Sequence, residues 1–345
     1  MKVKSDLQGI ELDFPEPINK RSIQQVSFNT SLQIKDGLTL KLTYDDKVNL
    51  AMHFKEGEFS AGQVYLGAIE AYVPSSPGMI VQGHVEKLNV NEWLDTWQGI
   101  QNLDKTYEEA SSSSTNPLSK VILSSDEIVY DDFIFEHVKT EISLSGDTWK
   151  INVDSPLAKG DISYELNKAT SINLQYLHWP ALIADEQNSD ADPLLEVNPA
   201  TFPALNLNIE EVFLGPTNYG RWKMKVSSDE QGAYLSGIDG EIKKLKVKGN
   251  ASWLKPLAKG TADKPEQTRL ELNLSSDDVG GIQRSWRKKS TLEAEKADVN
   301  LNLSWLNDPL GLEVKNFKGD VSLRLEDGRF IDAGDAAALN VFGIL

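Results

Sequence analysis

Apolar and polar residues alternate with a period of two along most of this 345-residue chain. Leu38, Leu40, Leu42 and Tyr44 alternate with polar neighbours. The same alternation returns in segments 48–54, 162–166, 172–176, 205–209, 270–274, 299–305 and 321–325. Successive side chains of a strand point to opposite faces, so each segment is predicted to be a strand with one apolar and one polar face.

Short turn signals separate the alternating segments. Asp36-Gly37, Glu56-Gly57 and Asp327-Gly328 are examples, and such pairs join neighbouring strands in antiparallel meanders. The sequence therefore predicts an all-β fold with a few short helices, built on antiparallel sheet.

One segment has helical spacing and divides the chain. Asn91 is a cap residue, and Trp93, Leu94, Trp97 and Ile100 follow at helical intervals, which predicts a helix from Asn91 to about Ala110. We expect residues 1–110 to be a β-meander ending in this helix and 111–119 to be a linker. Residues 120–345 are expected to continue the β-structure and to be truncated at the C-terminal end, where the chain stops on an apolar run.

The net charge of −17 and the absence of cysteine exclude several classes of function. Binding to nucleic acid relies on phosphate neutralisation by Lys and Arg, which an acidic chain does not supply. Without cysteine there is no disulfide scaffold, thiolate metal site or cysteine nucleophile. No apolar run reaches the length that spans a bilayer.

The sequence contains no pattern that predicts catalysis. The four histidines, His53, His84, His137 and His178, are dispersed, and no pair has metal-ligand spacing on a helix. There is no nucleophile elbow or phosphate-binding glycine loop. We therefore expect a protein that is not an enzyme and that needs no cofactor or metal; a hydrolase using a carboxylate pair is a remote alternative.

One cluster of basic residues has two interpretations. Arg284, Arg287, Lys288 and Lys289 surround Trp286. The simpler interpretation is a solvated turn between strands. The alternative is a contact for an anionic headgroup, with Trp286 at the boundary between apolar and polar surroundings.

Several ordered segments resemble the YhdP branch of the AsmA-like proteins. Those in the last part of the chain are Leu303–Pro309, Phe317–Val321, Glu326–Phe330 and the tail Phe342–Leu345. Those further upstream are Gly83–Trp97, Trp149–Ile151, Ser155–Gly160, Asn198-Pro199, Phe202–Leu205 and Tyr219–Trp222. Together they cover most of the chain in the family's order.

This resemblance implies a fold and a function. It implies the periplasmic part of an inner-membrane-anchored envelope protein, whose long curved antiparallel sheet forms an elongated apolar groove. It further implies transport of phospholipid between the inner and outer membranes and maintenance of the outer-membrane barrier. The membranes would be reached through parts of the parent protein outside this sequence, and other envelope proteins are conceivable partners.

Alternation alone favours a different architecture, a closed β-sandwich in which two apolar faces meet and no ligand enters. Such a module would serve a structural or protein-interaction role in the envelope. The resemblance reverses that preference in favour of the open groove. The residues predicted to line it are Leu270, Leu272, Leu274, Val299, Leu301, Leu303, Val321, Leu323 and Leu325.

Overall fold

The computed structural model describes residues 1–107, 118–131, 133–179, 194, 197–255, 266–286, 292–310 and 314–330. The chain divides into two compact units, Met1–Leu166 and Asn167–Leu345, called here the N-terminal and C-terminal units. The predicted linker at 111–119 lies almost wholly outside the described residues, so the predicted division at that point remains a prediction.

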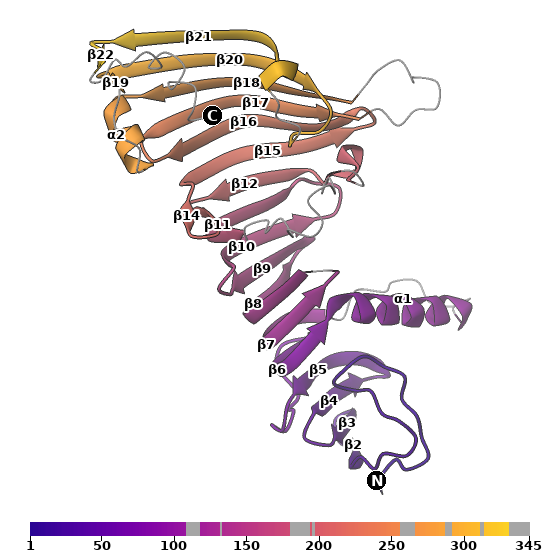
Figure 1. Cartoon of the computed structure of the whole chain (residues 1–345). Helices are drawn as coiled ribbons and strands as arrows, with labels where there is room; N and C mark the ends of the chain where they lie inside the picture. Colours follow the sequence, from indigo (N-terminus) through magenta and orange to yellow (C-terminus); the bar gives the residue numbers. More distant parts are fainter. Residues whose placement is uncertain are drawn as a thin grey trace. The chain divides into compact units, whose positions relative to one another are not determined.

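In its described residues the N-terminal unit is a ladder of ten strands with one helix (Figure 1). Its elements are β1 (Lys2–Ser5), β2 (Phe28–Ile34), β3 (Leu38–Tyr44), β4 (Val48–Lys55), β5 (Glu58–Leu66), β6 (Gly78–Asn89), α1 (Val90–Tyr107), β7 (Leu118–Tyr130), β8 (Phe133–Ser145), β9 (Thr148–Asp154) and β10 (Ala158–Glu165). Strands β1 to β10 pair in chain order, each with the next.

Three neighbouring strands in this unit, β5, β6 and β7, run parallel. Parallel neighbours need a crossover connection, which segment 67–77 and helix α1 provide. The fully buried Gln63 accepts a hydrogen bond from the Tyr72 backbone N–H (3.0 Å), which fixes the first crossover against β5. The indole N–H of Trp93 donates to the carbonyl of Glu16 (3.0 Å) and attaches the start of α1 to the N-terminal segment.

In its described residues the C-terminal unit is built around ten further paired strands. Its elements are β11 (Thr170–Trp179), η1 (Pro199–Thr201), β12 (Leu205–Ile209), β13 (Val212–Leu214), β14 (Thr217–Asn218), β15 (Arg221–Asp229), β16 (Gly232–Ile242), β17 (Leu245–Leu254), β18 (Gln267–Ser276), α2 (Val279–Ser285), β19 (Leu292–Glu293), β20 (Lys296–Leu306), η2 (Val314–Asn316), β21 (Lys318–Glu326) and β22 (Arg329–Phe330). Strands β12, β15, β16, β17, β18, β20 and β21 pair antiparallel in that order. β11 lies parallel to β12 and β13, and β14 pairs with β13.

The all-β prediction is confirmed, and most strand pairs are antiparallel as expected. The pairs β5–β6, β6–β7, β11–β12 and β11–β13 are parallel exceptions to the predicted antiparallel sheet. A period of two fixes which way side chains point and not the direction of the neighbouring strand, so the sequence pattern could not distinguish them. The predicted helix is α1; its predicted end near Ala110 is outside the described residues.

No described helix is both long and apolar enough to cross a bilayer.

Candidate functional site

All nine predicted lining residues lie on one face of the C-terminal sheet. Leu270, Leu272 and Leu274 of β18 stand directly opposite Leu303, Leu301 and Val299 of β20. On β21, Val321, Leu323 and Leu325 stand opposite Leu301, Val299 and Ala297. Directly opposed residues of paired strands share a face, so the structure brings the three predicted triplets together.

This apolar face continues across most of the C-terminal ladder. One row of directly paired residues crosses eight strands, and we call it the C-terminal row. Its members are Leu174, Ile209, Trp222, Gly240, Val247, Leu274, Val299 and Leu323. With neighbouring strands about 4.8 Å apart, seven steps give an apolar track of about 34 Å at right angles to the strands.

The N-terminal unit has an equivalent row on its own sheet, which we call the N-terminal row. Its members are Leu42, Leu50, Val64, Val81, Val121, Ile142, Ile151 and Ile162. The parallel strands β6 and β7 do not interrupt it, because their register keeps Val81 and Val121 side by side. Each unit therefore carries an apolar track that runs across its strands; the N-terminal row is entirely aliphatic, and the C-terminal row includes Trp222 and Gly240.

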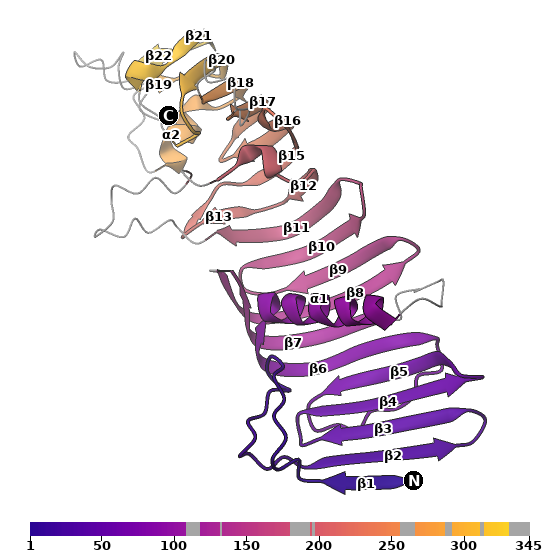
Figure 2. The same ribbon diagram turned by 90° about the vertical axis from the view of Figure 1, so that its right-hand side faces the viewer.

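Side chains on the C-terminal apolar face pack mainly against one another. Ile238, Val247, Leu274 and Leu301 are more than 90% buried and form one cluster, although all four belong to the same face of one sheet. These four side chains also pack against partly buried neighbours on the same face, among them Leu272, Val299 and Leu303. Figure 2 shows the curvature of strands β15 to β21.

Two glycines on this face permit the close packing. A Cβ on Gly240 would lie 2.7 Å from the Trp222 ring, so the missing side chain leaves room for that indole to lie across β16. Gly249 has a φ of +152°, and a Cβ there would lie 1.9 Å from the Glu271 carbonyl oxygen. A residue with a side chain would force β17 and β18 apart at this point.

No second sheet faces either apolar track within the described residues. On the C-terminal ladder, η1 contacts β15, β16 and β17, while α2 packs beside β19 at the strand ends. The two-residue strands β19 and β22 pair only with each other in the described chain. The described residues thus lack the opposing layer of a two-sheet sandwich, and Val321 and Leu323 remain 47% and 41% exposed.

Aromatic side chains gather at both ends of the C-terminal strands, a feature that sequence reasoning missed. One end, the α2 rim, carries His178 stacked on Phe213 (ring centroids 4.2 Å apart) and Tyr219 beside Trp286 (5.8 Å). The other end, the η1 rim, carries two further pairs, Phe202–Trp253 (6.2 Å) and Trp305–Phe317 (5.4 Å). These residues are far apart in sequence, so only strand register reveals the two rims.

The face has aromatic residues at both strand ends and mainly aliphatic residues between them. A bilayer has the same order, with interfacial aromatic residues on both sides of a hydrocarbon core. Tyr and Trp combine an apolar ring with a polar tip and are enriched where acyl chains meet headgroups. At the η1 rim the indole N–H groups are satisfied internally: Trp253 donates to Glu266 Oε1 (2.6 Å) and Trp305 to the Asp308 carbonyl (2.9 Å). Both rings are almost fully buried, so this rim is the more closed of the two.

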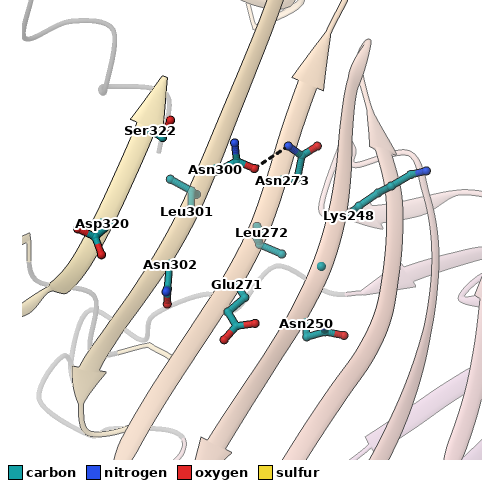
Figure 3. A pocket seen from close by; sticks show the side chains of 11 residues that line it. Lys248, Asn250, Glu271, Leu272, Asn273, Asn300, Leu301, Asn302, Asp320 and Ser322 are labelled. Atoms are coloured by element: carbon teal, nitrogen blue, oxygen red, sulfur yellow. Dashed lines mark hydrogen bonds between the residues drawn. The ribbon is translucent and has the colours of Figure 1, made fainter. Parts of the chain in front are cut away.

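The opposite face of the C-terminal sheet is polar. A shallow pocket there is lined mostly by polar residues, among them Lys248, Glu271, Asn273 and Asn300, and also by Gly249, Leu272 and Leu301 (Figure 3). Asn273 donates to Asn300 Oδ1 across the strand pair (2.9 Å). The two faces of these strands therefore differ sharply in character, as the alternation predicts.

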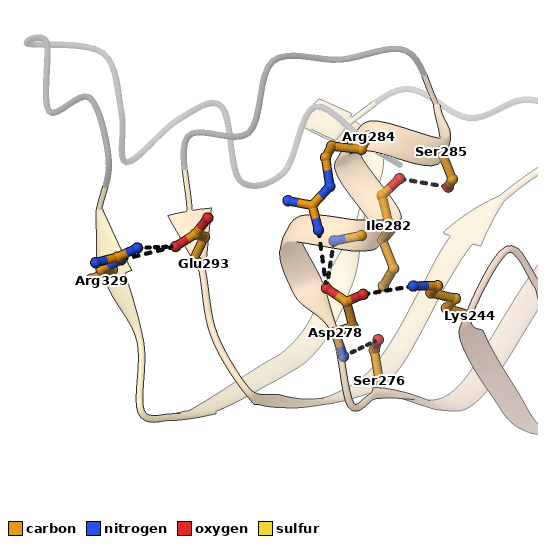
Figure 4. Close-up of polar contacts among 9 residues, drawn as sticks. Lys244, Ser276, Asp278, Ile282, Arg284, Ser285, Glu293 and Arg329 are labelled. Carbon is orange, nitrogen blue, oxygen red and sulfur yellow. Dashed lines mark hydrogen bonds and ion pairs between the residues drawn. The ribbon is translucent and has the colours of Figure 1, made fainter.

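Of the predicted basic cluster, only Arg284 lies within the described residues; Arg287, Lys288 and Lys289 lie outside them. The Arg284 guanidinium lies 3.6 Å from Asp278, which also accepts a 2.7 Å hydrogen bond from Lys244 (Figure 4). The Lys244 hydrogen bond and the Gly281 backbone N–H hold the pKa of Asp278 below its ordinary value. The headgroup role of this cluster stays a prediction.

Two of the dispersed histidines meet on the outer face of the N-terminal sheet. His84 Nε2 and His137 Nδ1 lie 3.5 Å and 3.9 Å from the two carboxylate oxygens of Asp126. All three side chains are more than half exposed. Within the described part of the chain, no three His, Asp or Glu side chains are arranged to hold a metal ion.

Comparison with known proteins identifies the family. The family model described as YhdP protein matches residues 1–345. The chain belongs to the YhdP family. The resemblance inferred from the ordered segments is thereby confirmed over the whole sequence. No curated protein matches the chain. No solved structure matches it either.

Proposed function

We propose that this chain is a lipid-binding and lipid-transport segment of an envelope protein, which carries phospholipid between the inner and outer membranes and so maintains the outer-membrane permeability barrier. The supporting observation is the pair of continuous apolar rows, each on a sheet face without an opposing layer in the described residues. Membership of the YhdP family supports the same proposal.

The energetics favour a sheltered path for the acyl chains. Exposing a chain of about sixteen carbons to water costs roughly 12 kcal/mol, at about 0.8 kcal/mol per methylene group. An apolar face of mainly Leu, Val, Ile and Met side chains offsets this cost without recognising any single acyl geometry. Because the C-terminal row runs at right angles to the strands, a bound tail moves from one strand to the next without crossing a polar side chain.

The path needs no chemical step, and we propose that the protein is not an enzyme. The headgroup stays at the rim, in water, while the tails lie along the row. We place the segment in the periplasm, in a protein attached to the inner membrane through parts outside this sequence. Phospholipid is the proposed cargo and the two membranes are its source and destination.

Lipid retention tests the proposal directly. The 345-residue chain, purified without detergent, is examined by native mass spectrometry and by lipid extraction. We expect co-purifying phospholipid, and we expect its loss when Leu272 is replaced by Asp. Asn273→Asp is the matched control, because it adds the same carboxylate to the polar face of the same strand.

Two results would contradict the proposal. A folded, monomeric wild-type chain that neither retains phospholipid nor takes it up from vesicles would favour the structural or protein-interaction module. Equal lipid content in Leu272→Asp and Asn273→Asp, with both variants folded by circular dichroism, would mean that the apolar face is not the binding surface.

A further inference from the structure

A cation and two aromatic side chains meet at the α2 rim. The Lys243 ammonium nitrogen lies 3.7 Å from the centre of the Trp286 ring, which is the geometry of a cation–π contact. Tyr219 packs against the same indole with ring centroids 5.8 Å apart. Lys243 comes from the β16–β17 turn, Trp286 from the end of α2 and Tyr219 from the approach to β15.

The turn that presents Lys243 adopts a conformation unfavourable for its sequence. Lys243 and Lys244 both have positive φ, 44° and 74°, and they join Ile242 to Leu245 as a two-residue hairpin turn. Such turns favour Asn-Gly, because left-handed backbone costs about 1 kcal/mol or more for a residue with a long side chain. Strained positions of this kind are concentrated at functional sites.

The two lysines of the turn differ in their partners. Lys244 is paired with Asp278 at 2.7 Å, while Lys243 has no carboxylate partner among the described residues. Around them, Arg284 also approaches Asp278 (3.6 Å) and Lys246 approaches Asp277 (3.3 Å). Glu241, directly opposite Lys246 on the paired strand, is the third carboxylate beside these four cationic side chains. Positive charge is therefore in excess at this turn, although the whole chain carries a net charge of −17.

Three hydrogen-bond donors here are uncommitted within the described chain. They are the Lys243 ammonium group, the Trp286 indole N–H and the Tyr219 hydroxyl, for which the only contacts are those with one another's rings. By contrast, the indoles of the η1 rim donate to internal acceptors. Free donors beside excess positive charge suit an anionic oxygen ligand.

The cluster lies directly next to the apolar track. Ile242 and Leu245, the residues that flank the lysine turn, pack against the buried cluster of Ile238, Val247, Leu274 and Leu301. Trp222, a member of the C-terminal row, donates its indole N–H to the Tyr219 carbonyl (2.9 Å). An acyl chain on the row and a phosphate at Lys243 can thus belong to one molecule.

We infer that Lys243, Trp286 and Tyr219 form a binding site for the phosphate of a phospholipid whose tails occupy the C-terminal row. The inference rests on the proposed function and adds an anionic headgroup position to it. Lys243 supplies the charge-assisted contact to the phosphate. The two aromatic rings hold its ammonium group at the end of the apolar row, and the ion pair of Lys244 with Asp278 fixes the turn.

The test compares two lipids that share acyl chains and differ in the phosphate. The 345-residue chain is titrated with vesicles containing phosphatidylglycerol or diacylglycerol, and bound lipid is measured by native mass spectrometry. Lys243→Asn removes the charge while suiting the left-handed backbone, so thermal stability should be unchanged or higher. Lys248→Asn, on the polar face of β17, is the control for loss of one positive charge.

We expect Lys243→Asn to weaken phosphatidylglycerol binding by about three- to tenfold, as for one partly buried charge-assisted contact. Diacylglycerol binding should be unchanged, and Lys248→Asn should match the wild type for both lipids. Millimolar inorganic phosphate should not displace the bound phosphatidylglycerol, because the tails hold it on the row.

Three outcomes would overturn the inference. If Lys243→Asn weakens the binding of both lipids equally, or of neither, Lys243 does not bind the phosphate. The lipid-binding proposal would then stand without the headgroup site. If inorganic phosphate displaces phosphatidylglycerol, the cluster is a free-anion site. If the wild type binds neither lipid, the proposed function fails and the headgroup site fails with it.

Discussion

Leu323 offers the sharpest test of whether the apolar row contacts lipid. It stands opposite Val299 at the edge of the C-terminal row, and 41% of it is exposed. Fully burying a leucine side chain contributes about 1.5–3 kcal/mol, so a lipid that covers the exposed two fifths gains roughly 0.6–1.2 kcal/mol. Leu323→Asp removes that gain and also places a carboxylate against acyl chains, which adds a desolvation cost. We expect a total loss of at least about 1 kcal/mol, or about fivefold in affinity.

The assay is titration with a phospholipid followed by native mass spectrometry, with thermal unfolding of each variant measured in parallel. Ser322→Asp is the matched control, since Ser322 is exposed on the opposite face of the same strand. Its stability should change by no more than about 0.5 kcal/mol, as for an ordinary surface substitution. If Leu323→Asp binds lipid as tightly as Ser322→Asp, the tails do not lie on this row and the reasoning is wrong.

Three further predictions concern the scaffold. Gly240→Ala should destabilise the protein by about 1–3 kcal/mol through overpacking, because the new Cβ would lie 2.7 Å from the Trp222 ring, and so should lower the unfolding temperature; an unchanged temperature would contradict the packing described. Trp305→Phe removes an indole N–H bond to a backbone carbonyl and should cost about 0.5–1.5 kcal/mol in chemical denaturation, and a neutral effect would mean that the bond is dispensable. The pKa of Asp278 is lowered chiefly by the Lys244 hydrogen bond, so its stabilising contribution is complete above the ordinary value of 3.8 and is lost as the pH falls below it. Asp278→Asn should therefore flatten the acid side of a plot of unfolding temperature against pH, and an identical slope in both proteins would refute this.

The lysine turn shows why part of the site is invisible in the sequence. In the sequence, Lys243-Lys244 between two alternating segments predicts an ordinary solvated turn. Trp286 is predicted to belong to a separate basic cluster. The sequence predicts a headgroup contact at Arg284 and its neighbours. At the α2 rim, however, Arg284 lies near Asp278, and the cation without a carboxylate partner among the described residues is Lys243. Their meeting depends on α2 folding back beside the β16–β17 turn, a long-range contact that no local pattern encodes.

Alternation by itself determined the strands, their two unlike faces and which of the nine predicted residues share the apolar face. Leu270, Leu272 and Leu274 had to share a face, because a strand sends every second side chain the same way. Whether that face meets a second sheet, a ligand or water was not determined, since the same period of two builds sandwiches and open sheets alike. The tertiary structure adds the strand register, which aligns Leu274 with Val247 and Val299, and it places no second sheet against this face within the described residues. It also decided where the sheet runs parallel and where the aromatic rims lie, because pairing between strands distant in sequence is a property of the folded chain.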